Sequence, residues 1–178
     1  MNPLEQGENM IHGRWWNSEL KDGYHRLTPR AESKVRGAVW RLSKQSAGLS
    51  VCFHTNAPSV KVRYKVTGGL NMFHMPTTGV SGVDLYATDA NGVLRWCASK
   101  FNLSFKDTIN YEFKDLTYFT GVDRGYDFEL FLPLYNEVAW MEIGVPEDHE
   151  LRFIPASADK PIVVYGTSIA QGACASRT

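Results

Sequence analysis

The residues of this chain with the clearest capacity for chemistry lie near its C-terminus. A short apolar run, residues 162–165, leads into Gly166, Thr167 and Ser168, and small residues follow. In an α/β sheet, a strand that ends in a tight glycine turn delivers the next side chain to the carboxyl edge, where ligands bind. Backbone amides at the start of a following helix stabilise negative charge on a tetrahedral intermediate. This pattern predicts that Ser168 is the nucleophile of a hydrolase.

A serine of this kind needs a general base, because its hydroxyl is a weak nucleophile near neutral pH. Residues 169–178 contain no histidine. Upstream, Asp22 and His25 have Asp-x-x-His spacing, and Asp148 adjoins His149. A catalytic triad is defined by geometry and not by spacing in the sequence, so we expect these histidines to be structural or solvated. We therefore expect residues 1–178 to be inactive on their own.

A second candidate is the long irregular stretch formed by residues 68–82, which has Phe73, His74 and Met75 at its centre. Long loops in small domains often carry function, and apolar side chains on them need a cover. One interpretation is that these three residues face a substrate pocket of a catalytic domain. The other is that the loop packs on itself and closes its own domain.

The adjacent residues Trp15 and Trp16 are a third candidate. An exposed aromatic ring on a β-domain can stack against the apolar face of a sugar ring. Aromatic residues of β-proteins also belong to the core, which is the commoner outcome. The sequence leaves both interpretations open.

The elements that must position these residues are predicted to be β-strands. From residue 39 to residue 145 apolar and polar residues alternate with period two, and turn residues separate the runs. In the clearest run Val60, Val62 and Tyr64 share one face, so that face should be core and the other solvent. Asn91 and Gly92 give the best hairpin signal. The expected strands are residues 49–55, 60–66, 83–88, 93–99, 108–113, 126–133 and 137–145.

The pattern changes at residues 146–161, where three prolines and mixed charges predict a surface connector. The continuous apolar run at residues 162–165 then predicts a strand covered on both faces, which is typical of a parallel α/β sheet. We therefore place a domain boundary near Ala156. The unpaired amides of such a strand favour three alternatives: it joins the edge of the preceding domain, pairs with another molecule to form an oligomer, or is disordered.

Composition excludes several classes of partner. The chain has 178 residues, of which 43% are hydrophobic, so it can bury a core. Nineteen basic residues balance 19 acidic ones, which argues against nucleic acid as a partner. No apolar run approaches the roughly 20 residues of a membrane helix, so we expect no membrane partner. Cys52, Cys97 and Cys174 are odd in number and widely spaced, so we expect free thiols and neither a disulfide framework nor a metal site.

Two motifs carry a resemblance to a known family. The Gly166-Thr167-Ser168 block is similar to the first block of SGNH, or GDSL-like, esterases. Thr167 replaces the aspartate that the commonest form of this block has. Upstream, residues 82–86 read Gly-Val-Asp-Leu-Tyr, which resembles the Gly-x-Asp-Leu-Tyr motif of a β-sandwich domain that precedes SGNH domains in bacterial proteins. The lone carboxylate of that motif, Asp84, is expected to bond turn amides and not to act in catalysis.

This resemblance implies an all-β, jelly-roll-like sandwich in residues 1–156, followed in residues 157–178 by a linker and the first strand and turn of an incomplete SGNH domain. It also implies that Ser168 is the nucleophile, with its own backbone amide as one oxyanion donor, and that no metal or organic cofactor is used. The other catalytic groups of the family, including a late Asp-x-x-His, come from a catalytic domain that would be the partner of this one.

The substrate implied is an acyl ester, for example one on a carbohydrate, and the location is the bacterial periplasm or the exterior after removal of a signal peptide. The alternatives are a non-catalytic carbohydrate-binding module and a structural interaction domain.

Overall fold

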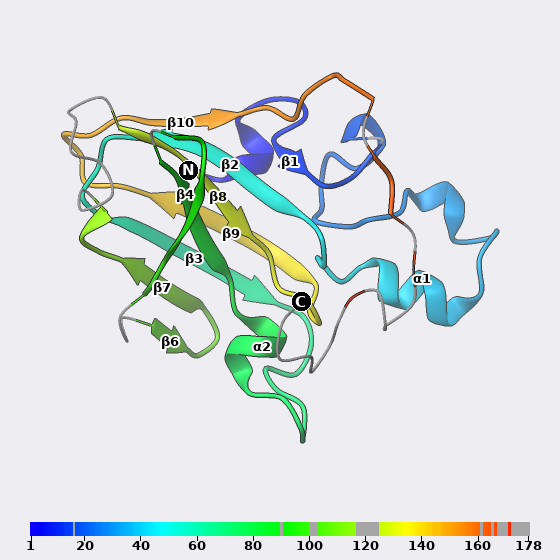
Figure 1. The fold of residues 1–178 in the computed structure, drawn as a ribbon. Coiled ribbons are helices and arrows are strands. Elements are labelled where there is room, and N and C mark those ends of the chain that lie inside the picture. Colours follow the sequence, from blue (N-terminus) through cyan, green and yellow to red (C-terminus); the bar gives the residue numbers. More distant parts are fainter. Residues whose placement is uncertain are drawn as a thin grey trace.

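The chain folds into two antiparallel β-sheets packed face to face (Figure 1). The computed structural model describes residues 1–15, 17–89, 91–99, 103–116, 125–160, 162–164, 166 and 171. The two facing sheets confirm the predicted all-β sandwich. Among the described residues, no helix is long and apolar enough to cross a membrane.

The first sheet has six strands, and its centre is β2 (Ser50–Thr55) paired with β8 (Tyr126–Phe131). Beyond β8 come β4 (Asp84–Thr88) and β5 (Leu94–Cys97). The other edge of β2 is shared end to end by β1 (Ile11–His12) and β10 (Leu151–Ile154).

The second sheet has the order β6 (Leu103–Phe105), β7 (Ile109–Phe113), β3 (Val60–Val66) and β9 (Val138–Gly144). Strand β3 follows the predicted alternation, because Val60, Val62 and Tyr64 are fully buried while the lysine and arginine side chains between them are exposed. The charged face of β3 is paired with acidic residues of its neighbours, through Lys61 with Glu112 and Arg63 with Glu142.

The core lies between the two sheets and is built from the inward residues of both. Phe53 of β2 stacks on Phe128 of β8, with ring centroids 5.6 Å apart, and meets Phe153 of β10 edge-on at 6.3 Å. On the second sheet, Tyr111 packs against Phe105 and Phe113. In the predicted strands, these aromatic contacts lie on the faces that were predicted to form the core.

Helices are short and lie outside the sheets: η1 (Pro3–Glu5), η2 (Asn17–Glu19), η3 (Pro29–Ala31), α1 (Gly37–Ser43) and α2 (Thr77–Ser81). The irregular segment before α1 is held by Arg14, whose guanidinium donates to the carbonyls of Leu20, Gly23 and His25. Burial lowers the pKa of Arg14 to about 10. A buried guanidinium with three carbonyl partners can organise a loop that has no regular backbone hydrogen bonds.

Two expectations about elements are wrong, and two short strands were not predicted. The period-two pattern was expected to begin at residue 39, but residues 37–43 form α1. The connector expected at residues 146–161 contains β10, a four-residue edge strand flanked by prolines that buries Phe153. The two-residue strand β1 and the three-residue strand β6 were not expected. Elements this short are decided by their pairing partners, because their own sequences carry too few periods to be detected.

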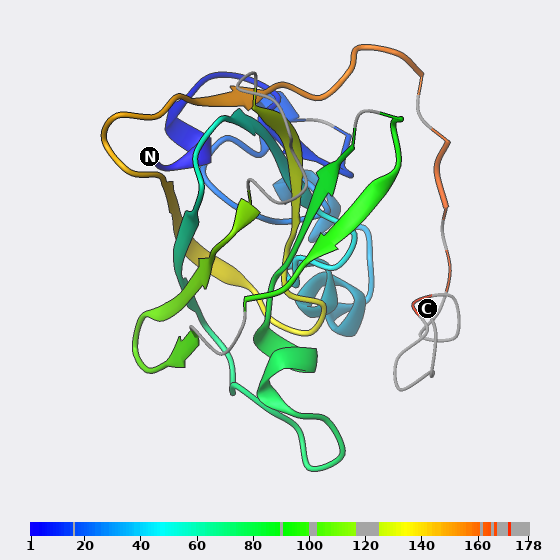
Figure 2. The same cartoon turned by 60° about the vertical axis from the view of Figure 1, so that its left-hand side comes forward.

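The apolar run near the C-terminus is not a strand where it is described. Ile162, Val163 and Val164 are 94%, 76% and 84% exposed and have no strand assignment. The segment after β10 leaves the sandwich and runs down one side of it in Figure 2. A strand buried on both faces needs neighbours on both sides, and no described strand lies against these residues.

Candidate functional site

Ser168, the predicted nucleophile, lies outside the described residues, as do Thr167 and the residue on its other side. The described residue that follows them, Gln171, donates a side-chain hydrogen bond to the carbonyl of Leu134 at 3.2 Å. Leu134 belongs to the turn between β8 and β9 and is 39% exposed. Gln171 therefore lies at this turn, and the next residue of the turn, Tyr135, donates its amide to the Val80 carbonyl of α2 at 3.1 Å.

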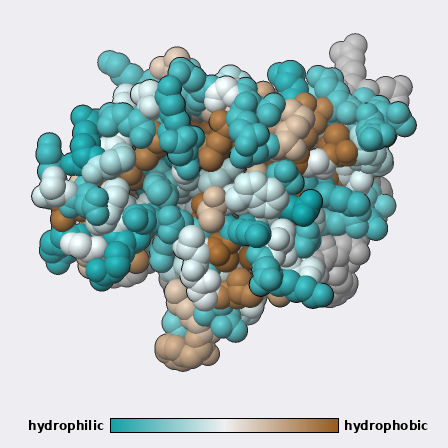
Figure 3. All heavy atoms as spheres, turned by 180° about the vertical axis from the view of Figure 1, so that it is seen from behind, coloured by the Kyte–Doolittle hydropathy of each residue, from teal (hydrophilic) through white to brown (hydrophobic). Residues whose placement is uncertain are grey.

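The predicted loop at residues 68–82 is a two-stranded projection followed by α2. Met72 and Met75 exchange backbone hydrogen bonds of 3.1 Å, which makes a tight hairpin with Phe73 and His74 at its tip. The Phe73 side chain is fully exposed, and its ring lies 4.3 Å from that of His74. This projection, which we call the Phe73 hairpin (residues 70–76), extends from the lower edge of the molecule in Figures 2 and 3.

The tip of the Phe73 hairpin is exposed, and no described residue covers Phe73. From residue 66 to residue 83 the sequence has no Asp, Glu, Lys or Arg. Charged residues are depleted at the centres of protein interfaces, where aromatic and methionine side chains are enriched. The Phe73 side chain is not packed on its own loop, whereas Met75 is half-buried and Leu70 packs on the core, so the pocket-facing and self-packed interpretations both stay predictions.

A buried polar network fixes the base of the Phe73 hairpin. The side chain of Asn136, which is 3% exposed, donates to the Gly69 carbonyl at 3.0 Å and to the Ser81 hydroxyl at 2.9 Å. Its amide oxygen accepts from the Gly68 backbone at 2.9 Å. The Ser81 hydroxyl donates onward to the Leu70 carbonyl at 2.9 Å. A network in which every member is satisfied rigidifies its surroundings, so the hairpin projects in one defined direction.

The Gly-x-Asp-Leu-Tyr motif begins where this network ends. A Cβ on Gly82 would lie 2.2 Å from the Thr78 carbonyl oxygen and 2.8 Å from the Tyr111 hydroxyl. The φ angle of Gly82 is −75°, which any residue can adopt, so backbone strain does not require glycine here. Glycine is required because the neighbouring atoms leave no room for a Cβ. Leu85 is fully buried in the core, so the motif ties α2 to the sandwich.

Asp84 does not bond turn amides, which corrects the expectation for this residue. It is exposed on the outer face of β4, and its carboxylate accepts from the indole N–H of Trp96 at 3.3 Å. The turn amides of the β4–β5 hairpin are bonded instead by Asp89, which accepts from the amides of Asn91 and Val93. Together with Arg95, these hydrogen bonds lower the pKa of Asp89.

The two tryptophans near the N-terminus are only partly described. Trp15 is 51% exposed, which removes it from the core and keeps sugar stacking as a prediction. Trp16 lies outside the described residues. Sequence reasoning did not single out Trp96, which is more exposed than Trp15 at 57%. Strand alternation does not find it, because in the sequence Trp96 shares the apolar phase of Leu94 and Ala98, opposite Arg95.

Three of the five histidines have side-chain hydrogen-bond partners, while the buried Nδ1 atom of His149 has none among the described residues and His74 lies at the exposed hairpin tip. His25 bonds Glu137 at 2.8 Å and His54 bonds Asp127 at 2.7 Å. The Nε2–H group of His12 donates to the Ile154 carbonyl at 2.8 Å, at the end of β10. No group of three His, Cys, Asp or Glu side chains in the described part of the chain could hold a metal ion.

The fold defines a two-sheet β-sandwich, and family comparisons define the class to which this sandwich belongs. The family model for the GxDLY N-terminus of SGNH-hydrolase-type esterases matches residues 1–151, and the chain belongs to this family. A second model, for the GDSL-like lipase and acylhydrolase family, matches residues 159–178. The two matches follow one another along the sequence.

A solved structure agrees with this assignment. A protein from Bacteroides ovatus assigned as a GDSL-like lipase is similar in fold, with a TM-score of 0.72 and 26% sequence identity. The similarity covers 93% of this chain and 46% of that structure, so the chain spans less than half of the length of its structural relative. A comparison with curated proteins finds no match.

Proposed function

We propose that this chain is the accessory β-sandwich of an SGNH-type serine esterase, in which Ser168 attacks an acyl ester. The observation that carries the proposal is the order of the two family matches, because the nucleophile block of residues 159–178 follows the sandwich directly. In this reaction the Ser168 oxygen bonds to the acyl carbon, the alcohol leaves with a proton, and water then releases the acid. The backbone amide of Ser168 is one oxyanion donor.

The Phe73 hairpin is proposed to face the pocket of the catalytic domain. Phe73, His74 and Met75 provide an apolar surface without ionised residues, held rigid by the buried Asn136 network. An acyl chain or the apolar face of a sugar would complement such a surface. The domain boundary near Ala156 belongs to the same proposal.

The general base is proposed to come from the catalytic domain. The residues that follow Ser168 in this sequence contain no histidine, and three of the five upstream histidines already bond Glu137, Asp127 and a backbone carbonyl. A serine without a base is a poor nucleophile. Residues 1–178 alone are therefore proposed to be inactive. The protein translated from the whole reading frame, which we call the whole-gene protein, is proposed to be active.

Hydrolysis of p-nitrophenyl acetate tests the proposal. The whole-gene protein should turn the ester over, and Ser168→Ala should lower kcat by about a thousandfold or more, as for other removed nucleophiles. Ser157→Ala is the matched control in the exposed connector and should leave the rate unchanged. If residues 1–178 alone turn over the ester faster than their own Ser168→Ala variant, the proposed division of labour is wrong.

A carbohydrate-binding role without catalysis is the second candidate, and the half-exposed ring of Trp15 favours it. It predicts oligosaccharide binding that Trp15→Ala removes, in a whole-gene protein without esterase activity.

A further inference from the structure

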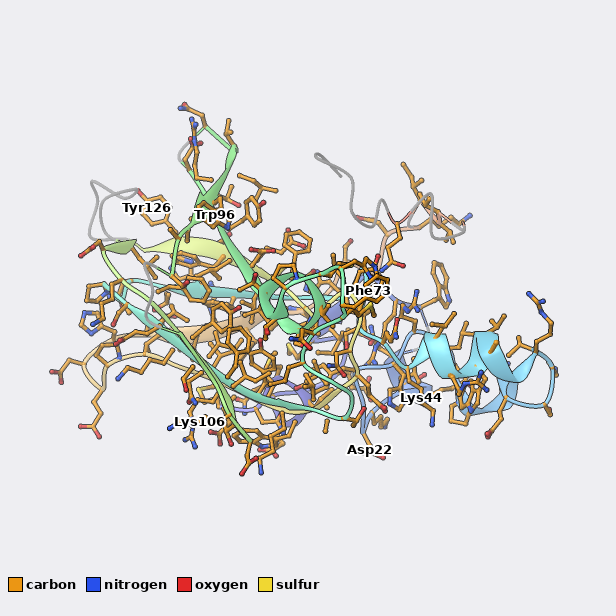
Figure 4. The ribbon with its side chains drawn as sticks, turned by 90° about the horizontal axis from the view of Figure 1, so that it is seen from below. Asp22, Lys44, Phe73, Trp96, Lys106 and Tyr126 are labelled. Carbon is orange, nitrogen blue, oxygen red and sulfur yellow. The ribbon has the colours of Figure 1, made fainter. Side chains whose placement is uncertain are left out.

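The outer face of the six-stranded sheet carries an aromatic surface that the proposed chemistry does not use. Trp96 of β5 is 57% exposed and lies opposite Tyr86 of β4 in the strand register. Tyr86 packs edge-to-face on Phe131 of β8, with centroids 5.6 Å apart and an interplanar angle of 88°. We call Trp96, Tyr86, Phe131 and Asp84 the Trp96 platform. In Figure 4 Trp96 lies well apart from Phe73.

A hydrogen bond at the N–H edge of the ring holds the indole of Trp96 in place. Its N–H donates to Asp84 at 3.3 Å, which satisfies the polar atom of the ring. Because the N–H is already bonded and more than half of the side chain is exposed, the accessible part of the ring is its apolar surface. An orientation fixed by a hydrogen bond lowers the entropy lost when a ligand stacks on the ring.

Hydrogen-bond acceptors border the platform. Asp84 uses one carboxylate oxygen for Trp96, and Glu129 uses one for the Ser50 hydroxyl at 2.7 Å. The second oxygen of each carboxylate has no partner among the described residues. In the strand register Glu129 lies opposite Tyr86, and Asp84 lies opposite Phe131. Acceptors and aromatic rings therefore alternate across neighbouring strands.

The combination of aromatic rings and carboxylates disfavours two kinds of ligand, namely another protein surface and an anion. Charged residues are depleted at the centres of protein interfaces, and here the carboxylates of Asp84 and Glu129 adjoin the rings. Anionic ligands are repelled by these carboxylates, and the nearby cation Arg95 is paired with Asp89 at 3.0 Å. A neutral ligand with apolar C–H faces and many hydroxyl donors meets both the rings and the acceptors.

We propose that the Trp96 platform binds a carbohydrate, with a sugar ring stacked on Trp96 and hydroxyl groups donating to Asp84 and Glu129. The inference rests on the proposed function and deepens it, because it makes a carbohydrate the carrier of the ester. It also moves the predicted stacking residue from Trp15 to Trp96. Sugar binding requires neither Ser168 nor hydrolysis, so the two proposals can fail separately.

Titration of the 15N-labelled chain with xylo-, cello-, manno- and chito-oligosaccharides tests the platform. At least one series should shift the indole N–H resonance of Trp96 in a saturable way. Trp96→Ala should weaken binding by about tenfold or more, since a lost stacking contact is of this size. Asp84→Asn, which keeps the side-chain volume, should also weaken binding. Trp15→Ala and Val93→Ala, which remove other exposed apolar groups, should leave the affinity unchanged.

Each other result contradicts the platform. These results are the absence of binding by every series at millimolar concentration, and binding that persists in a folded Trp96→Ala variant. Binding by residues 1–178 that disappears in the whole-gene protein would show that the catalytic domain covers the platform, and also contradicts the inference. Ser168→Ala should keep full sugar binding, whatever happens to esterase activity.

Discussion

Gly82, the first residue of the Gly-x-Asp-Leu-Tyr motif, is required for steric reasons that can be tested directly. Gly82→Ala places a Cβ against the Thr78 carbonyl and the Tyr111 hydroxyl, both within 2.8 Å. We expect it to lower the free energy of unfolding by about 2 kcal/mol, the usual size of an overpacked site. Urea unfolding measures the loss. Gly144→Ala is the control, because nothing lies within 4 Å of its Cβ position and the change should be small.

Asn136 is the residue that sequence reasoning passed over and the structure makes central to the hairpin. Asn136→Ala leaves the Gly69 carbonyl and the Gly68 amide without their partner, and we expect a cost of about 2 kcal/mol. The amides of Met72 and Met75 should then exchange with solvent faster. Asn71→Ala, an exposed change in the same hairpin, should alter neither quantity. Unchanged exchange in a folded Asn136→Ala variant would contradict the rigid-hairpin argument.

At the scale of elements, β10 marks where the sandwich ends. A chain that stops after Ala156 should melt at the same temperature as residues 1–178, because the described residues 157–160 and 162–164 are exposed. A chain that stops after Glu150 loses β10 and the buried Phe153, so its melting temperature should fall sharply. Thermal unfolding followed by circular dichroism compares the two. Equal melting temperatures for both truncations would contradict this boundary.

Seven strands could be predicted from the sequence, and all of them except β5 alternate over enough residues to bury one face. For β3 the pattern at Val60, Val62 and Tyr64 is sufficient by itself. Strand β10 could not be predicted, because its four residues are a strand only when β2 offers an open edge. Trp96 was predicted to lie in a strand, but its role depends on Asp84 of the neighbouring strand, and a contact between strands is set by their register.

At the scale of the whole molecule, buried tyrosine hydroxyl and cysteine thiol groups predict that the folded protein loses stability at alkaline pH. Burial raises the pKa of Tyr111 from 10.0 to about 12 and that of Cys97 from 9.0 to about 11. Burial raises the pKa of Tyr24 and Tyr64 as well. The unfolded chain therefore loses these protons at a lower pH than the folded chain, and binds fewer protons in that range.

The free energy of unfolding is thus expected to fall as the pH rises from about 9 toward 12, between the unfolded and folded pKa values of these groups. Urea unfolding at a series of pH values measures this dependence. Tyr64→Phe removes one of the titrating groups, so its pH dependence should be shallower than that of the parent chain. A free energy of unfolding that rises over this range would contradict the assigned burial.

The proposed role of the sandwich depends on Ser168 being the nucleophile of the esterase to which it belongs. Labelling with a fluorophosphonate, which reacts with activated serines, followed by peptide mass spectrometry tests this assignment at the residue itself. We predict a single adduct on Ser168 in the whole-gene protein, with none in residues 1–178 alone and none in the Ser168→Ala variant. An adduct on a different serine of an active whole-gene protein would contradict the assignment.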